Sequence, residues 1–535
     1  MWAAPPAGRE VRFLYGELLH ADGSVNGLTS VAGQIKSGNG GACAPPIAYQ
    51  VDNYTLRGDA PTEEWSPPFT WHSGRYVQIW ADDAALAALD VAASRCYPLR
   101  SDLARVGAFA SSSPLLNAVH AAELVTFESN MMSVQSDCPA RERLGYGGDA
   151  LMSFDAISYN FDTALFYEKR VRDFLDAQRA NGGFTETAPF VGIADAGMGG
   201  GSGPIGWETV VPVLAAHLLA RSGNLPLAAA ALPAVARYVA FLSTATAIES
   251  GLGDWMTLER PALALTGRGF EAMSYASAAA LADAVGNASA AAAWRAAAAA
   301  TADYINAQFL DARTGVYAKA GQFNATQCGQ AMPLYLGIVP PAAAPAALAV
   351  LAENVLAHGG HLQVGGFGVK WLLMALSDGG RADLAWGIMN ATTYPSHGYM
   401  LSGVDNKLTN ATSIWESWFT SDDTYSHNHA MFTGNQVWFY EALAGIRMAA
   451  PTWAAVRFAP APPPPGHGLD AVQASLDTPR GRVSAAWTLA ADGAFALTIC
   501  VPPNVRAAVR LPGATADVDA GTCCGCIFNG TVAAR

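Results

Sequence analysis

The stretch TALFYEKRVRDFLDAQRANGG, residues 163–183, shows the secondary structure that prevails in the middle of this chain. Its apolar residues recur at helical spacing and form one stripe: Leu165, Phe166, Val171, Phe174 and Leu175. The glycine pair at 182–183 is expected to end this amphipathic helix. Similar segments, punctuated by glycine, continue from residue 114 to residue 448.

This helical tract carries no alternating strand and helix pattern. Such a long all-helical tract indicates a closed array of helices, an α/α barrel, rather than a small bundle. We expect pairs of helices arranged around a toroid, and residues 111–450 as one domain.

β-Structure is predicted on both sides of the helical tract. Residues 11–25 predict a strand, a turn at 21–23 and a return, and residues 74–81 predict another strand, so residues 1–110 are expected to be a β-sandwich. The proline-rich tract 458–468 marks a boundary. Beyond it, apolar residues alternate over 483–489 and 495–501 around an Asp-Gly turn, which predicts a hairpin within a second sandwich at 451–535.

Composition limits the class of partner. The 535 residues carry a formal net charge of −13 and include no basic run, so nucleic acid and anionic membranes are disfavoured, and a neutral partner fits better. The apolar tract 278–300 is mostly alanine with two charges, which predicts a helix and no transmembrane span. Nothing in the sequence indicates the oligomeric state.

Cysteines and sequons leave the compartment open. Four of the eight cysteines crowd the C-terminus, at 500, 523, 524 and 526, and a disulfide to Cys500 or free thiols is favoured over a metal site. Six Asn-x-Ser/Thr sequons favour a secreted or endomembrane glycoprotein: Asn53, Asn287, Asn324, Asn390, Asn410 and Asn529. The first ten residues lack the apolar core of a signal peptide, so we expect a processed or incomplete N-terminus.

Two polar motifs stand out in the helical tract. SDCPARERLGYGGDA, residues 136–150, concentrates charge in a chain that is only 14% charged. TSIWESWF, residues 412–419, places Glu416 between two tryptophans, and His427 and His429 follow. Two carboxylates near aromatic walls suggest an acid and a base acting on opposite faces of a sugar ring. Taken singly, each motif is more often structural, as an ion-pair cluster or a helix cap.

The first motif resembles the DCPQR(D)ERLGWTGDA signature of the bacterial-type α-L-rhamnosidases of glycoside hydrolase family 78. The resemblance continues through GDWM at 253–256, GFGVKWLLMAL at 366–376, IWESW at 414–418 and SHNHAMF at 426–432, and includes both β-flanks. It implies a central (α/α)6 barrel between two antiparallel β-sandwiches. It also implies an exo-acting, inverting hydrolase for terminal α-L-rhamnose, which needs no metal or cofactor.

The resemblance implies a role for each matching residue. Glu142 would be the general acid and Glu416 the general base. The residues expected to bind the sugar are Asp137, Arg141, Tyr146, Asp149, Trp207, Trp255 and His429. An inverting pair would stand roughly 6.5 to 9.5 Å apart, to leave room for water. We expect burial and neighbouring carboxylates to raise the pKa of Glu142, provided that Arg143 does not pair with it.

The sequence departs from the signature at Tyr146, where tryptophan is usual, at Gly147, where threonine is usual, and at Ser417, where arginine is common. Glu208 stands where an aspartate is common, and the interval between Glu416 and His429 is short, as if a loop were trimmed. Two alternatives therefore stay open: a weakened relative that only binds carbohydrate, and an inverting barrel glycosidase for another terminal sugar. The glycine-rich tract 197–206 lacks the lysine of a phosphate loop and is expected to be a flexible loop at the rim.

Overall fold

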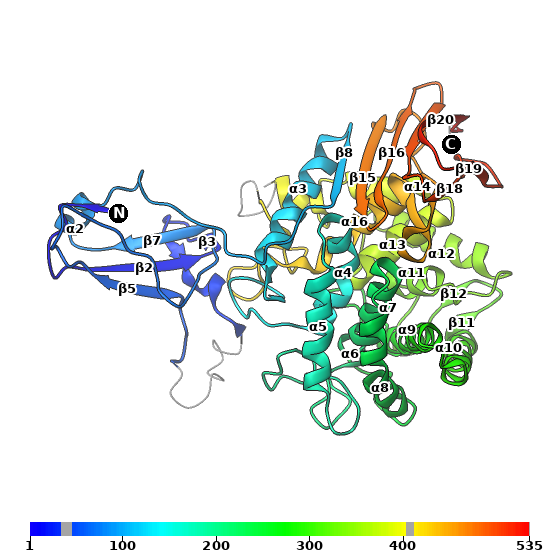
Figure 1. Cartoon of the computed structure of the whole chain (residues 1–535), viewed down its shortest axis with the longest axis horizontal. Coiled ribbons are helices and arrows are strands. Elements are labelled where there is room, and N and C mark those ends of the chain that lie inside the picture. Colours follow the sequence, from blue (N-terminus) through cyan, green and yellow to red (C-terminus); the bar gives the residue numbers. More distant parts are fainter. Residues whose placement is uncertain (34–44, 403–410, 534–535) are drawn as a thin grey trace.

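The computed structural model describes residues 1–33, 45–402 and 411–533, so the sequon at Asn410 lies outside the described residues. An N-terminal β region, a helical middle and a C-terminal β region follow one another along the chain. The N-terminal region lies at one end of the long axis, and the helical and C-terminal regions lie together at the other (Figure 1).

The N-terminal region is built on a three-stranded antiparallel sheet in the order β5-β2-β7. A small core of its own includes Trp2, Val11 and Leu56. The predicted turn at 21–23 is confirmed, since β3 and β4 pair on either side of it. The elements are β1 Trp2–Ala3, β2 Glu10–Gly16, β3 Leu18–Leu19, β4 Val25–Asn26, the 3-10 helix η1 Gly27–Ser30, β5 Val51–Thr55, β6 Thr62–Glu63, β7 Tyr76–Trp80 and α2 Asp83–Ala88.

The middle of the chain is helical, as its periodicity predicts. Successive helices pack as neighbours, for example α9 on α10 and α7 on α8. The helices are α3 Pro114–Asn130, α4 Gly147–Asn160, α5 Ala164–Ala177, α6 Ile205–Glu208, α7 Val210–Ser222, α8 Leu225–Leu242, α9 Leu263–Ala284, α10 Ala288–Phe309, α11 Gln327–Tyr335, α12 Ala344–Ala357, α13 Gly366–Asp378, α14 Ala382–Asn390, α15 His397–Ser402 and α16 Asn435–Trp438. Short elements between and after them are β9 Met131–Met132, β10 Val134–Gln135, β11 Leu310–Asp311, β12 Val316–Tyr317, the 3-10 helix η2 Ala430–Thr433 and the π-helical turn η3 Phe439–Leu443.

Helix α5 confirms most of the predicted stripe. Phe166, Val171 and Phe174 are buried, but Leu165 is 82% exposed and the helix ends at Ala177, before the glycine pair. Leu165 lies one residue, about 100° around the helix, from Phe166, and so falls outside the buried stripe. Arg170, in contrast, is buried.

Two sheets form the C-terminal region. One has the order β20-β17-β16-β15-β8, and the other has the order β13-β14-β18-β19 with β14 and β18 parallel. The predicted hairpin is confirmed: Val483 to Leu489 alternate inward in β16, which pairs antiparallel with β17. The strands are β8 Gly107–Ser111, β13 Ile446–Ala450, β14 Ala455–Phe458, β15 Ala471–Thr478, β16 Gly481–Leu489, β17 Ala494–Cys500, β18 Arg506–Val509, β19 Val518–Gly521 and β20 Cys524–Thr531. The 3-10 helix η4 Pro451–Trp453 lies between β13 and β14.

Strand β8 lies at the predicted domain boundary at residue 110 and pairs with a strand of the C-terminal region. It precedes the helices in sequence, yet it pairs antiparallel with β15, from Ser111 opposite Val472 to Gly107 opposite Leu476. A boundary at residue 110 would cut through this strand. The one at 450 separates β13 from its partner β14. The pairing of β8 leaves no signal in the local sequence, because its partner β15 lies more than 300 residues away.

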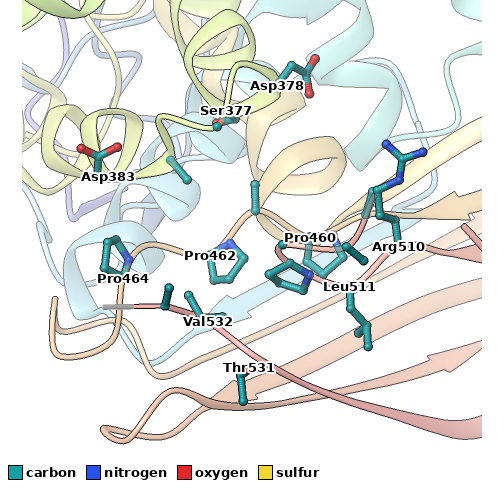
Figure 2. A pocket seen from close by; sticks show the side chains of 18 of the residues that line it. Ser377, Asp378, Asp383, Pro460, Pro462, Pro464, Arg510, Leu511, Thr531 and Val532 are labelled. Carbon is teal, nitrogen blue, oxygen red and sulfur yellow. The ribbon is translucent and has the colours of Figure 1, made fainter. Parts of the chain in front are cut away.

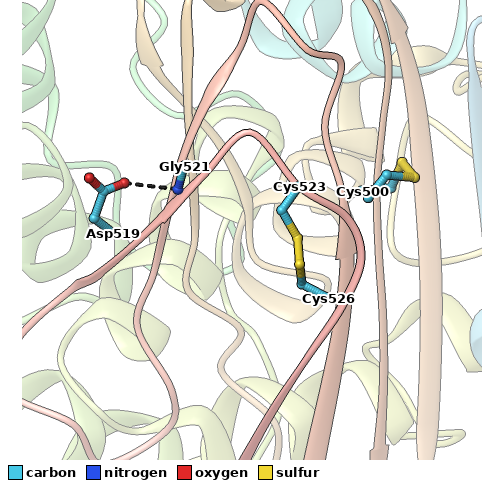
Figure 3. The surroundings of a disulfide bond; sticks show 6 residues. Cys500, Asp519, Gly521, Cys523 and Cys526 are labelled. Atoms are coloured by element: carbon cyan, nitrogen blue, oxygen red, sulfur yellow. Dashed lines mark hydrogen bonds between the residues drawn. A yellow bond between two sulfur atoms is a disulfide. The ribbon is translucent and has the colours of Figure 1, made fainter.

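The C-terminal cysteines form two disulfides. Cys500 at the end of β17 is joined to Cys524 at the start of β20, which confirms the predicted disulfide to Cys500. Cys523, which directly precedes β20, is joined to Cys526 near the start of that strand (Figure 3). The sequence does not predict this pairing.

Among the described residues, one helix, α8, is long and apolar enough by length and composition to cross a membrane. It packs against α7 and α9, and Leu227, Val235 and Tyr238 are buried among the core residues. Core helices have the same length and composition, so these properties alone are weak evidence for a span.

Candidate active site

The first motif is a turn that leads into helix α4. Asp137 and Leu144 close it: the Asp137 N–H donates to the Leu144 carbonyl at 3.0 Å, and the Leu144 N–H donates to Asp137 Oδ1 at 2.8 Å. Helix α4 begins at Gly147, and Asp149 lies in its first turn. The motif is thus a folded loop in front of a helix N-terminus, and Glu142 lies on that loop.

A buried arginine holds the end of this turn. The Arg170 guanidinium, from α5, donates to the carbonyl oxygens of Gly145, Tyr146 and Ala188, with the Tyr146 contact at 3.1 Å. A guanidinium can satisfy several carbonyls at once because it carries five donors in a fixed plane. Arg170 therefore fixes the backbone that presents Tyr146.

Arg143 points away from Glu142, as the assignment of a general acid requires. Its guanidinium lies 4.0 Å over the Trp71 ring and donates to Gln50 Oε1 at 2.8 Å, both in the N-terminal region. The segment is not a helix, and Arg143 has a positive φ of 60°.

The second motif brings Glu416 to the same place. The Ser426 N–H donates to Glu416 Oε2 at 3.0 Å, and the Glu416 N–H donates to the Ser426 carbonyl at 2.9 Å. His429 joins the two motifs: its Nε2 lies 2.6 Å from Asp149 Oδ1, and its Nδ1 lies 3.6 Å from Glu416 Oε2. The imidazole is therefore held between two carboxylates from opposite ends of the helical tract.

The two glutamates have oppositely shifted pKa values. Burial raises the pKa of Glu142, the negative charges of Glu416 and Asp149 add to the rise, and a hydrogen bond from the Tyr146 hydroxyl at 2.7 Å opposes it. Burial would also raise the pKa of Glu416, but the positive charge of His429 and the Ser426 N–H outweigh it and hold the pKa below its usual range. One carboxyl thus favours its protonated form and the other its ionised form.

Asp137 and His429 complete the electrostatics. Burial raises the pKa of Asp137, and the charge of Glu142 adds to the rise. Burial alone would lower the pKa of His429, but Glu416 and Asp149 raise it well above its usual value. The two carboxylates therefore favour the imidazolium form of His429, whose charge offsets part of the negative charge in the cluster.

Trp207 lies next to the first motif, and Trp255 lies next to the start of helix α13. Trp207, in α6, is buried, and a Cβ atom on Gly148 would come within 2.2 Å of its ring, so Gly148 is the residue that lets the indole approach α4. Trp255 is half-buried. Its neighbour Asp254 accepts the N–H groups of Gly365 at 2.7 Å and Gly368 at 2.9 Å, and so caps the start of α13.

Arg141 binds the backbone of two other segments. Its guanidinium donates to four backbone carbonyls, those of Leu28 at 3.5 Å, Val31 at 3.2 Å, Asp423 at 2.7 Å and Tyr425 at 3.0 Å. Its donors are thus directed at the chain itself rather than at the carboxylate cluster. The geometry favours a role in holding the motifs together over direct contact with sugar hydroxyls.

Two further carboxylates near the site, Glu186 and Glu17, are not predicted from the sequence. Glu186 is buried beside the site, accepts the Asp195 N–H at 2.6 Å, and has its pKa raised to about 8, chiefly by burial. Glu17 comes from the N-terminal region and contacts both motifs. No local pattern distinguishes either residue, since their positions depend on contacts distant in sequence.

The substituted positions have ordinary local partners. The Ser417 hydroxyl donates to the Phe419 carbonyl at 2.6 Å, and Glu208 accepts the Phe184 N–H at 3.2 Å. The glycine-rich tract is a loop that leads into α6, as predicted.

Within residues 1–33, 45–402 and 411–533, no group of three or more His, Cys, Asp or Glu side chains is placed to hold a metal ion. A cavity of about 700 Å³ lies elsewhere, between the C-terminal end of α13 and the C-terminal sheets. Figure 2 shows prolines 460, 462 and 464 and Arg510 along it. Its charged side chains already form ion pairs, such as that of Arg447 with Asp378.

The helical region belongs to the class of six-hairpin glycosidases. Residues 104–443 match the bacterial alpha-L-rhamnosidase 6 hairpin glycosidase domain. Residues 2–96 match the concanavalin-like domain of the same proteins, and residues 445–522 match their C-terminal domain. The chain belongs to the bacterial α-L-rhamnosidase family.

Several proteins resemble the chain over most of its length. An alpha-L-rhamnosidase of Streptomyces avermitilis is 29% identical over 95% of this chain and 46% of the relative, and one of Formosa agariphila is 26% identical over 86% and 50%. The structure of an alpha-L-rhamnosidase from Dictyoglumus thermophilum superposes with a TM-score of 0.82 at 28% identity, covering 96% of this chain and 55% of that one. The structure of the Streptomyces avermitilis enzyme complexed with L-rhamnose superposes with a TM-score of 0.77 at 25% identity, covering 99% and 50%. The chain spans about half the length of the curated relatives it matches.

Proposed function

We propose that the chain removes terminal α-L-rhamnose from a rhamnose-containing glycoside or polysaccharide by inverting hydrolysis. The observation that carries the proposal is the pair of glutamates whose pKa values shift in opposite directions within one cluster: Glu142 upward and Glu416 downward. A general acid must hold its proton and a general base must be ionised at the same pH, so this is the polarity that the reaction needs.

In the proposed reaction, Glu142 donates its proton to the glycosidic oxygen as the bond between that oxygen and the anomeric carbon breaks. Glu416 takes a proton from a water molecule that attacks the anomeric carbon from the opposite face. The product is β-L-rhamnose, and each glutamate returns to its starting state by exchanging a proton with solvent. His429 holds Glu416 ionised and in place through its contacts with that carboxylate and with Asp149.

The remaining predicted residues have proposed roles that follow from their places. Tyr146 and Trp255 are half-buried, which suits aromatic faces that pack against a sugar ring, while buried Trp207 would support that wall. Asp149 and His429 would contact sugar hydroxyls. Asp137 and Arg141, whose polar atoms bind the chain itself, would hold the turn that carries Glu142.

We further propose that the helical region forms an (α/α)6 barrel and that the flanking β regions are sandwiches. The helix pairs that pack as neighbours support the barrel. The two C-terminal sheets, each with a buried face, support the second sandwich. We propose domains at residues 1–110, 111–450 and 451–535, with two changes. Gly107–Ser111 joins the C-terminal sheet, and β13 is assigned to the same domain as its partner β14.

One observation favours a second candidate, a relative that binds carbohydrate without turning it over. The Tyr146 hydroxyl donates to Glu142, and a donor to a carboxylate stabilises the ionised form that cannot act as an acid. Tryptophan, which is usual at this position, could not place a hydroxyl there.

The test is release of the chromophore from an aryl α-L-rhamnoside across about pH 4 to 8, with the wild type, Glu142→Gln and Glu416→Gln. We expect wild-type turnover and a loss of about 10²- to 10⁴-fold in each variant. NMR of the first product should show β-L-rhamnose. A wild type that binds L-rhamnose without turnover would establish the second candidate, and turnover of a different aryl glycoside would reassign the sugar.

A further inference from the structure

Glu17 is a buried carboxylate that the N-terminal β region places against the helical region. It lies between β2 and β3 and is 5% exposed. The hydroxyl oxygen of Thr29, in η1, accepts its backbone N–H at 2.8 Å. A buried carboxylate needs compensating donors or cations, and both oxygens of Glu17 find them outside their own region.

Its first set of partners belongs to the segment that carries the candidate base. The Ser426 hydroxyl donates to Glu17 Oε1 at 3.2 Å, the His427 N–H donates to Oε2 at 3.0 Å, and His427 Nδ1 lies 3.2 Å from the same oxygen. Ser426 is also the residue whose N–H donates to Glu416. Glu17 and Glu416 therefore both accept hydrogen bonds from Ser426, one from its hydroxyl and the other from its N–H.

Its second partner belongs to the turn that carries the candidate acid. Arg141 Nε lies 3.9 Å from Glu17 Oε2, and both side chains are almost fully buried. The rest of the guanidinium binds two parts of the chain: the Leu28 and Val31 carbonyls of the N-terminal region, and the Asp423 and Tyr425 carbonyls near the base. Arg141 precedes Glu142 directly, so the position of its side chain constrains the turn.

We propose that Glu17 is a positioning residue for the catalytic pair: it holds the turn before Glu142 and the segment that supports Glu416 in one fixed arrangement. The inference rests on the proposed function for its catalytic meaning. Glu142 must donate a proton while Glu416 accepts one, so the two carboxyl groups must keep their spacing. A displacement of about 1 Å at such a site costs about 10²-fold in rate. The N-terminal region is then part of the active site rather than an appended module.

The competing interpretation is that Glu17 only joins two domains. Glu63 provides a matched control, because it is a carboxylate of the same region, is 1% exposed and accepts hydrogen bonds from the N–H groups of Arg57 at 3.0 Å and Gly58 at 3.1 Å. No contact of Glu63 reaches either motif among the described residues. Glu17→Gln and Glu63→Gln both remove one buried charge while keeping the side-chain shape.

The experiment compares the two variants in the full chain by kcat, KM, melting temperature and hydrogen–deuterium exchange. We expect Glu17→Gln to lower kcat by about 10- to 100-fold with little change in KM, and Glu63→Gln to lower the melting temperature with kcat within about twofold of the wild type. Deuterium uptake should rise in peptides covering residues 137–146 and 411–429 for Glu17→Gln alone. Ser426→Ala, which removes only the hydroxyl, should lower kcat less than additively with Glu17→Gln.

Equal kcat values for the two variants would overturn the proposal, whatever the loss of stability. If Glu17→Gln does not fold, Ser426→Ala decides by its own kcat. If the wild type turns over no rhamnoside, the proposed function fails. Deuterium uptake in residues 137–146 and 411–429 then tests the positioning role by itself. If uptake in Glu17→Gln equals that in Glu63→Gln, the positioning role is overturned.

Discussion

Removing the Tyr146 hydroxyl should move the alkaline limit of activity toward higher pH. In the wild type this hydroxyl donates to Glu142 at 2.7 Å in a largely buried setting. A hydrogen bond to a charged group is worth about 1.5–3 kcal/mol, and 1.36 kcal/mol corresponds to one pH unit. Tyr146→Phe loses this stabilisation of the ionised form, so the pKa of Glu142 rises further. Because the acid must be protonated to act, the alkaline limb of kcat/KM should move up by about one to two pH units.

The assay is kcat/KM for an aryl α-L-rhamnoside as a function of pH. Phenylalanine keeps the aromatic face, so KM should change little. Tyr159→Phe is the matched control, since the Tyr159 hydroxyl donates at the same 2.7 Å to a different half-buried glutamate, Glu441. An unmoved alkaline limb in Tyr146→Phe, or an equal movement in Tyr159→Phe, would refute Glu142 as the group that sets this limit.

Two further predictions concern the candidate base Glu416 and the packing of helix α4. His429→Gln removes the cation that holds the pKa of Glu416 low, so this pKa should rise. Because the base must be ionised to act, the acid limb of kcat/KM should move to higher pH. An unchanged acid limb would show that Glu416 is not the base that sets it. Gly148→Ala should destabilise the fold by about 1–3 kcal/mol, measured by denaturant unfolding, because its Cβ would stand 2.2 Å from the Trp207 ring. Gly387→Ala, at an exposed position of α14 with open space around it, should instead stabilise the fold by about 0.5–1 kcal/mol, and equal effects of the two would contradict the packing argument.

Local periodicity was enough to predict the helices and the C-terminal hairpin. The alternation over 483–489 corresponds residue by residue to the buried face of β16. Leu165 shows the limit of this reasoning: an apolar residue can sit one position off the stripe and point to solvent. Strand β8 shows another, because its partner β15 lies more than 300 residues away in sequence.

The candidate site was predictable only where the motif itself carries the information. The signature located Glu142 and Glu416 in the sequence, and in the structure His429 contacts both Glu416 and Asp149. The direction of Arg141 was not predictable, because its partners come from the N-terminal region and from residues 423 and 425. Glu17 likewise has no motif of its own.

The pairing of β8 with β15 also bears on how these proteins can be divided and recombined. A segment that starts after Ser111 would lack β8 and leave the N–H and C=O groups of β15 free along an edge, where another chain could pair with them and begin aggregation. Only a cut before Gly107 keeps that edge covered. The helical region and the C-terminal sheets should accordingly be inherited, exchanged and proteolysed as one unit, even though their family domains are drawn as two.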